Sequence, residues 1–327
     1  MKLFRSPRFK SPAPQLLSLL LLLAGMPTGA TQVKRAAVRK TKPALVLVVS
    51  RSDPEEPQSN MDAVVLVENG KLNQPYPEDE AAQKKIAGNY FARGKKYRVT
   101  FGGGEVGTAT VKSWDMGCNN IHAVATVDDN KKIPPRLSAL ATDSETLGKK
   151  PSARRPPTDA ERESVMRLVR QIYRSKGTTP AALNILKTTN LTATDLNGDG
   201  AFELIGSFVI ETRAKARRDL LLIAEAQTPQ RTAPLKAADP SGPSVSADAS
   251  FSAGPPLKAT LVNFQSYKLP PEGFDSAVDF LDQLDIDGDG IAEVFVQQHG
   301  FDAYGYSIYK KSRGIWRQVY TTTGDAC

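Results

Sequence analysis

Short apolar runs separated by turn signals dominate residues 44–127. The runs ALVLVVS and DAVVLVENGKL are rich in β-branched residues, and KKYRVTF, GTATVKSW and IHAVATV alternate or run apolar in strand fashion. Asn69-Gly70 predicts a two-residue hairpin, because both residues accept a positive φ. After Pro77, acids followed by lysines and then Gly88 predict a short helix. We therefore expect an N-terminal β-domain over residues 44–127.

The pattern changes twice in the rest of the chain. Residues 128–157 carry five prolines and many charges, which predicts a linker that is partly ordered at most. Thr158 and Glu161 then have the spacing of a capping box, and they predict a helix over residues 159–176. Its apolar positions fall on one face: Val165, Leu168, Val169 and Ile172. Residues 228–256 lack an apolar period and are expected to form a flexible insertion within a C-terminal domain, 158–327.

Two acidic stretches of similar sequence occur in this C-terminal domain, DLNGDGAFEL from Asp195 and DIDGDGIAEV from Asp285. Strand-like runs follow each of them. FELIGSFVIET and DLLLIAEA come after the first, with KATLVNFQSY and DSAVDFLDQL beyond the insertion, and AEVFVQQHG, YGYSIYKK and GIWRQVYTT come after the second. The sequence thus predicts a repeat in which an acidic loop leads into an antiparallel meander.

Each acidic loop places oxygen-bearing side chains at alternate positions around a glycine turn. Several carboxylates on a flexible turn, without nitrogen or sulfur ligands, suit Ca²⁺. The acids tolerate one another if a divalent ion neutralises them. Because the second loop has four carboxylates and the first has three, we expect tighter binding at the second. The predicted ligands are Asp195, Asn197, Asp199, the carbonyl of Ala201 and Glu203 in the first loop, and Asp285, Asp287, Asp289, the carbonyl of Ile291 and Glu293 in the second.

Neither loop is a complete EF-hand. The twelfth position, where an EF-hand has a bidentate Glu, is Gly206 in the first loop and Val296 in the second. The shortened pattern, followed by an aliphatic strand, resembles the calcium loops of FG-GAP and VCBS-type repeats in exported β-propeller proteins, over residues 190–320. The resemblance implies propeller-like blades with Ca²⁺ clamped at a strand start, and a role in adhesion, ligand recognition or architecture.

Two such units cannot close a propeller, which has about four to eight blades. We therefore expect propeller-blade-like meanders that do not close a ring. They would form an open two-sheet unit packed against the predicted helix, or an assembly between chains.

The first 30 residues predict a secretory signal peptide. A basic start precedes the apolar run LLSLLLLLAG from Leu16, and the small residues Thr28 and Ala30 suit cleavage. The apolar run is shorter than the roughly 20 residues of a membrane span, although an uncleaved anchor remains an alternative. After cleavage no membrane span is expected, and the protein would be secreted, periplasmic or at the cell surface.

The net charge of +8 comes from the N-terminal end of the chain. The signal and a basic arm, residues 31–43, hold the excess of positive charge, so the remainder is close to neutral and no nucleic-acid partner is expected. The two cysteines are Cys118 and Cys327. Export permits a disulfide between them, but the sequence leaves both the bridge and free thiols open.

Other motifs predict structure rather than chemistry. GGGEVG, residues 102–107, has the spacing of a nucleotide-binding loop, but the strand-like TATVKSW follows it, so a glycine hairpin is expected. His122 lies near Cys118, and we favour a structural histidine over a Cys/His nucleophile pair. Several aromatic residues gather near the C-terminus, and core packing is favoured over a ligand platform for them. They are Tyr304, Tyr306, Tyr309 and Trp316.

Together these features predict a mainly β protein of α+β class. We expect an exported, calcium-binding, non-enzymatic protein that binds an unidentified extracellular ligand, carbohydrate or protein, or serves surface architecture. The alternative is an extracellular hydrolase with scattered catalytic residues and structural calcium.

Overall fold

The structure is a computed structural model that describes most of the chain after residue 42. The described residues are 43–50, 58–77, 79–116, 121–129, 133–134, 138–213, 216–227, 256–268, 277–299, 303–322 and 325–326. The predicted signal peptide, nearly all of the basic arm, the insertion up to residue 255, and both cysteines lie outside these ranges. The described part is mainly β, as the sequence predicts, with three helices.

Six antiparallel strands form a closed barrel. Around the barrel the order is β1-β7-β4-β5-β6-β2, and β2 pairs back with β1. A short strand, β3, extends β2 through a hairpin, and helix α1 connects β3 to β4. The bounds are β1 Ala44–Ser50, β2 Gln58–Glu68, β3 Lys71–Asn73, α1 Glu80–Tyr90, β4 Lys96–Phe101, β5 Gly104–Met116, β6 Ile121–Asp128 and β7 Ala139–Thr142.

Two four-stranded meanders follow the barrel. We call β9-β10-β11-β12 the first meander and β13-β14-β15-β16 the second. The short β8 adds to the β9 edge of the first, and β17 pairs with β15 in the second. The bounds are β8 Arg154–Arg155, β9 Lys187–Thr194, β10 Glu203–Glu211, β11 Ala216–Ala226, β12 Leu257–Lys268, β13 Ala277–Leu284, β14 Glu293–His299, β15 Ala303–Ser312, β16 Ile315–Thr321 and β17 Asp325–Ala326.

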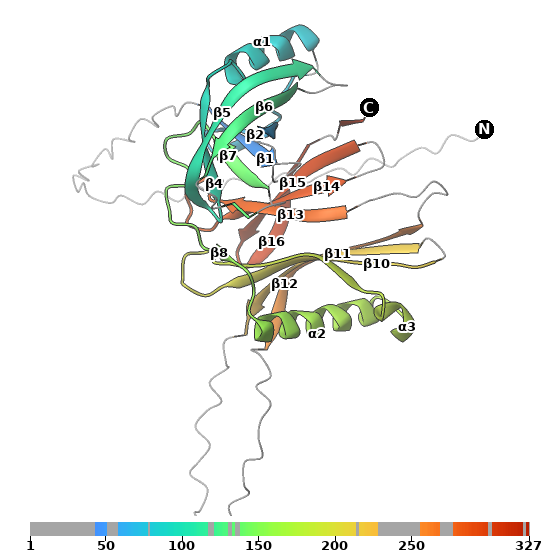
Figure 1. The fold of residues 1–327 in the computed structure, drawn as a ribbon. Coiled ribbons are helices and arrows are strands. Elements are labelled where there is room, and N and C mark those ends of the chain that lie inside the picture. Colours follow the sequence, from blue (N-terminus) through green and yellow to red (C-terminus); the bar gives the residue numbers. More distant parts are fainter. Residues whose placement is uncertain are drawn as a thin grey trace, which may run out of the picture. The chain divides into compact units, whose positions relative to one another are not determined.

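The hydrophobic contacts stack these sheets in layers. One face of the second meander, including Phe295 and Ile308, packs with Val46 and Val64 on the outside of the barrel. The opposite face of the second meander packs against the first meander, where Ile205 is fully buried. The far face of the first meander is covered by helix α2, Asp159–Ser175, which is followed by the short α3, Pro180–Leu183. Figure 1 shows α2 running beside β10, β11 and β12.

This layering explains why several strands are apolar without alternation. In β1, Leu45 and Leu47 face the barrel interior, whereas Val46 and Val48 face the second meander. A strand buried on both faces has no polar side to show, so its sequence reads as a continuous apolar run.

The predicted local signals at both helices and both glycine turns are confirmed. The capping box of Thr158 and Glu161 begins α2, and Asp79 caps α1, which continues two residues beyond Gly88. Asn69 and Gly70 have φ values of 50° and 75° in the β2–β3 hairpin. The GGGEVG segment forms the β4–β5 hairpin rather than a phosphate loop.

The predicted linker at residues 128–157 is wrong for the segment that forms β7. Residues 139–142 form β7, whose ALAT side chains are all buried and which joins β1 to β4 in the barrel. Four residues are too few to show a period between prolines and charges, so only the tertiary pairing identifies this strand. β9 was also missed, because its sequence KTTNLTAT is largely polar.

Candidate metal centre

The two acidic loops occupy the same place in the two meanders. The first, residues 195–202, connects β9 to β10, and the second, residues 285–292, connects β13 to β14. Both have the same backbone course. Gly198 and Gly288 have φ values of 73° and 78°, and Gly200 and Gly290 have values of 85° and 92°. Glycine adopts this left-handed region without steric cost, so the glycines of the motif permit the turn.

The first aspartate of each loop holds the turn together. Asp195 accepts hydrogen bonds from the backbone N–H of Gly198 at 2.7 Å and of Gly200 at 2.9 Å, one on each carboxylate oxygen. Asp285 does the same with Gly288 at 2.7 Å and Gly290 at 3.1 Å. A carboxylate oxygen has two lone pairs, so each of these oxygens keeps capacity for a second partner.

The middle residues of each loop use one side-chain oxygen for the backbone. Asn197 accepts from the N–H of Asp199 at 3.0 Å, and Asp199 accepts from that of Ala201 at 2.7 Å. The remaining oxygen of Asp199 receives the Asn197 side-chain amide at 3.0 Å.

In the second loop the equivalent pairs are Asp287 with the N–H of Asp289, at 3.4 Å, and Asp289 with the N–H of Ile291, at 2.9 Å. In both Asp287 and Asp289 this bond uses Oδ1, so Oδ2 faces a different partner.

A buried glutamate closes each loop from the following strand. Glu203 accepts from the N–H of Leu196 at 2.8 Å, and Glu293 accepts from that of Ile286 at 2.9 Å. Burial raises the pKa of each of these two carboxyls to about 7, and the backbone hydrogen bonds act in the opposite direction. Each glutamate therefore ties the first apolar residue of its loop to the start of the second strand.

That apolar residue anchors each loop in the next layer. Leu196 is buried against the second meander, and Ile286 is buried against the barrel. The loops also contact one another, because the N–H of Ala292 donates to the carbonyl of Leu196 at 2.7 Å. The two acidic loops are therefore neighbours in space as well as equivalents in sequence.

The second loop gathers the more compact set of acids. One carboxylate oxygen from each of Asp285, Asp287 and Asp289 lies within 4.8 Å of the others. In the first loop Asn197 replaces the central acid, although its amide keeps Asp199 close. Oxygen-only donors of this kind fit Ca²⁺, and the carbonyls of Ala201 and Ile291 remain predicted ligands.

Sequence reasoning missed Lys310, which lies in the second loop's ligand set. Its ammonium contacts Asp287, lies 2.7 Å from Asp289 Oδ2 and lies 3.1 Å from Glu293 Oε1. Although burial acts against it, hydrogen bonds to these three carboxylates raise the pKa of Lys310 above its usual value. Lys310 belongs to β15, and only the pairing of Val294 with Tyr309 brings it to the loop.

The first loop has a different neighbour in the equivalent strand. Leu204 pairs with Ala224 as Val294 pairs with Tyr309, so Glu225 occupies the register position of Lys310. Glu225 forms an ion pair with Lys311 of the second meander. Within the described ranges, no lysine or arginine nitrogen forms an ion pair with Asp195, Asp199 or Glu203.

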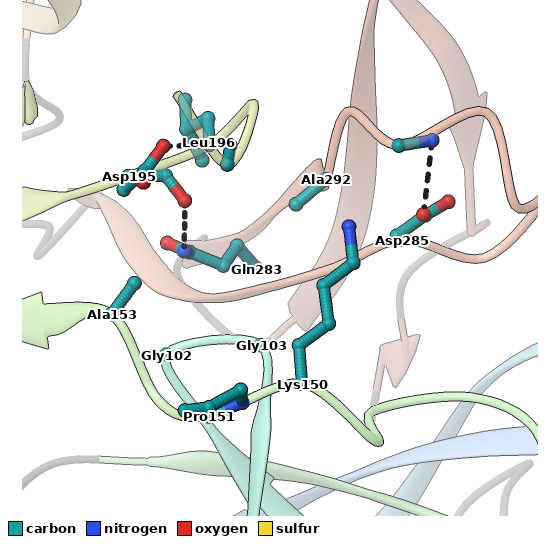
Figure 2. A pocket seen from close by; sticks show the side chains of 12 residues that line it. Gly102, Gly103, Lys150, Pro151, Ala153, Asp195, Leu196, Gln283, Asp285 and Ala292 are labelled. Carbon is teal, nitrogen blue, oxygen red and sulfur yellow. Dashed lines mark hydrogen bonds between the residues drawn. The ribbon is translucent and has the colours of Figure 1, made fainter. Parts of the chain in front are cut away.

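A cavity of about 220 Å³ separates the two loops from the barrel. Figure 2 shows Asp195 and Asp285 on two sides of it, Lys150 extending between them, and the Gly102-Gly103 hairpin below. Gln283 is almost fully buried and forms the inner wall. Its amide donates to the carbonyl of Asp195 at 3.4 Å and its oxygen accepts from Thr194. Both candidate metal loops, the barrel hairpin and the segment that leads into β8 therefore line the same cavity.

The other candidate residues lie outside the acidic loops. His122 Nδ1 lies 3.5 Å from Asp62 Oδ1 on neighbouring barrel strands. Tyr306 is buried between the barrel and the second meander, and Tyr309 and Trp316 are buried between the two meanders. The preference for core packing over an aromatic platform is confirmed for these three rings.

Comparisons with known proteins add no family. No protein-family model, curated protein or solved structure matches this chain. None of the helices in the described ranges has both the length and the apolar character needed to cross a bilayer.

Proposed function

We propose that the chain is an exported, non-enzymatic binding or surface-architecture protein that is built of two meanders of FG-GAP or VCBS type and is stabilised by calcium bound in at least one of its two acidic loops. The observation that carries the proposal is the paired acidic loop. Two loops with the same φ pattern and the same hydrogen bonds to Asp195 and Asp285 connect the first two strands of two meanders of the same strand order. A motif repeated with its geometry supports a metal-binding origin better than two unrelated turns do.

The residues of the loops fit a hard divalent cation. The ligand types are carboxylate, amide and carbonyl oxygens, and the described loop residues include no histidine or cysteine. The chain's own contribution is orientation. Backbone N–H groups hold both oxygens of the first aspartate of each loop and one oxygen of the later aspartates. Glu203 and Glu293 hold each loop against its strand. A bound Ca²⁺ would supply the positive charge that offsets the repulsion among these acids.

A ligand bound in the cavity beside the two loops would depend on how well ordered these loops are. The cavity is lined by both loops and by the barrel hairpin, so a ligand there would contact the acidic loops and the barrel together. We propose an extracellular carbohydrate or protein segment as the ligand class. The rival proposal, a hydrolase with structural calcium, would use the Asp62–His122 pair on the barrel rather than the acidic loops.

Thermal unfolding of the full chain tests the calcium proposal. If the dissociation constants are about 10⁻⁴ to 10⁻³ M, about 10 mM Ca²⁺ adds roughly 1.4–2.7 kcal/mol and raises Tm by about 3–10 °C relative to chelator. Asp199→Asn should abolish most of this rise. Glu163→Gln removes an exposed carboxylate of α2 and serves as the matched control. A Tm that is the same in calcium, magnesium and chelator would refute the proposal.

A further inference from the structure

In the second loop, the Lys310 ammonium donates hydrogen bonds to the side-chain oxygens that a metal ion would need as ligands. Asp287 and Asp289 each use Oδ1 for a backbone N–H, and each offers Oδ2 to the Lys310 ammonium. Glu293 likewise uses Oε2 for the N–H of Ile286 and offers Oε1 to Lys310. Every oxygen that these three acids leave free of the backbone is therefore shared with one ammonium.

We infer that Lys310 is the resident counter-ion of the second loop and makes this loop independent of metal. Charge-assisted hydrogen bonds are about twice as strong as neutral ones, and a cation entering the loop would have to replace three of them. The second loop is therefore closed by the chain itself. The first loop, which rests on the function proposed above, is the one that takes Ca²⁺.

The first meander shows what the loop is like without such a lysine. Glu225 stands at the register position of Lys310 and adds a negative charge near Glu203, which the more distant charge of Lys311 opposes without an ion pair to Glu203. Lys311 is turned to the first meander and contacts Glu225. Successive residues of a strand point to opposite faces. The Lys310 side chain of β15 therefore lies among the acids of the second loop, whereas the Lys311 side chain points to the first meander.

The space around Lys310 allows its side chain to be replaced without a steric clash. Lys310 forms part of the wall of a cavity of about 480 Å³ that is also lined by Gly70, Lys71 and Leu72 of the barrel hairpin. A side chain at position 310 therefore has space on its barrel side. Its identity can be changed without crowding the second loop, which makes substitution an informative test.

The first test uses chelator alone and needs no calcium. In the full chain, Lys310→Met leaves three neighbouring acids without their ammonium and should lower Tm by roughly 4–8 °C. Lys310→Arg keeps the charge and should restore most of the loss. Lys112→Met, at an exposed lysine of β5, is the matched control. In a background with Asp287→Asn and Asp289→Asn, where only Glu293 still contacts Lys310, the Lys310→Met effect should be much smaller than in the wild type.

The second test counts metal ions. Wild-type protein should bind one equivalent of Ca²⁺, and Lys310→Met should bind two, as measured by equilibrium dialysis. Asp199→Asn should abolish binding at the first loop, so it should remove one equivalent from both proteins.

Three results would overturn the inference: a Lys310→Met Tm equal to that of Lys112→Met in chelator, an effect unchanged by the Asn substitutions, or two equal calcium sites in the wild type. If the wild type binds no calcium, the proposed function fails, and the chelator experiment still decides the role of Lys310.

Discussion

The two acidic loops have nearly the same backbone and different electrostatic surroundings. In the first, Asp199 and Glu203 form no ion pair with an ammonium within the described part of the chain; the charge of Glu225 acts on Glu203, and that of Lys311, which is paired with Glu225, opposes it. In the second, Lys310 lies among Asp287, Asp289 and Glu293. The loop sequence alone favours the second for calcium because it has more acids. The neighbouring strand reverses that order, so a metal motif has to be judged together with the residues paired against it.

A second difference between the two meanders lies in the strands that precede the loops, β9 and β13. Thr192 of β9 and Asp282 of β13 occupy equivalent positions, opposite Ile205 and Phe295. Arg154 of β8 reaches both, with Nε 3.3 Å from the Thr192 hydroxyl and Nη1 3.2 Å from Asp282 Oδ1. The same guanidinium thus meets a neutral group in one meander and a charged one in the other.

The largest expected effect separates these two positions. Asp282 has no exposed side-chain surface, and it also accepts from the N–H of Gly102 at 2.9 Å. Asp282→Ala would leave the buried Arg154 without its counter-charge, so it should lower the free energy of unfolding by about 3–5 kcal/mol. Thr192→Val, which removes a neutral partner, should cost only about 1 kcal/mol. Urea denaturation of both variants measures the difference.

A matched third variant identifies the cause of this loss. Arg154→Met removes the buried cation, and in that background Asp282→Ala should cost much less than in the wild type. Equal costs in the two backgrounds would mean that Arg154 and Asp282 are not coupled.

A smaller and equal effect is expected at the anchors of the two loops. Leu196 and Ile286 are 2% and 5% exposed and pack into different layers. Truncation of either to Ala should cost about 2–4 kcal/mol through lost burial and a residual cavity. Because the anchors do not contact the candidate metal, both losses should be the same in calcium and in chelator. A loss at Leu196 that appears only in chelator would show that calcium, rather than packing, holds the first loop.

The sequence predicts much of this fold where its signals are local. The Asn69-Gly70 turn, the capping box of α2 and the strands that follow each acidic loop depend on residues close together in the chain. β7 and β9 were missed because their identity depends on partners. β7 is four residues long between β1 and β4, and β9 is a polar strand supported by β10.

The candidate site follows the same rule. Spacing predicts that Asp285, Asp287 and Asp289 come together, since the glycine turn is encoded within the loop itself. Lys310 lies in another strand, and nothing near it in the sequence marks it as a partner of these acids. A register argument that matched β11 with β15 would have placed Glu225 and Lys310 at one position. The strand-like runs of both meanders contain the information for that alignment.

The smallest effect concerns the outer layer, where the first meander is covered by α2 and the second by the barrel. Glu161 closes the capping box of α2 and accepts from both Nη atoms of Arg155 at 2.8 Å. The Arg155 guanidinium lies 4.2 Å from the ring centroid of Phe202, at the end of the first loop.

The hydrogen bonds from Arg155, and then those from Thr158, lower the pKa of Glu161 to about 2 from its ordinary 4.5. A carboxyl with a depressed pKa in the folded state contributes stability above about pH 4.5, and this contribution is lost as the pH falls towards 2. Glu161→Gln should therefore cost about 1–2 kcal/mol at pH 7, since Arg155 is partly exposed and solvent screens the ion pair. It should cost almost nothing near pH 2. Urea denaturation across this range, with Glu163→Gln as the control, should give curves that converge with acid. Parallel curves would mean that the Glu161 contacts do not stabilise the cover of the first meander.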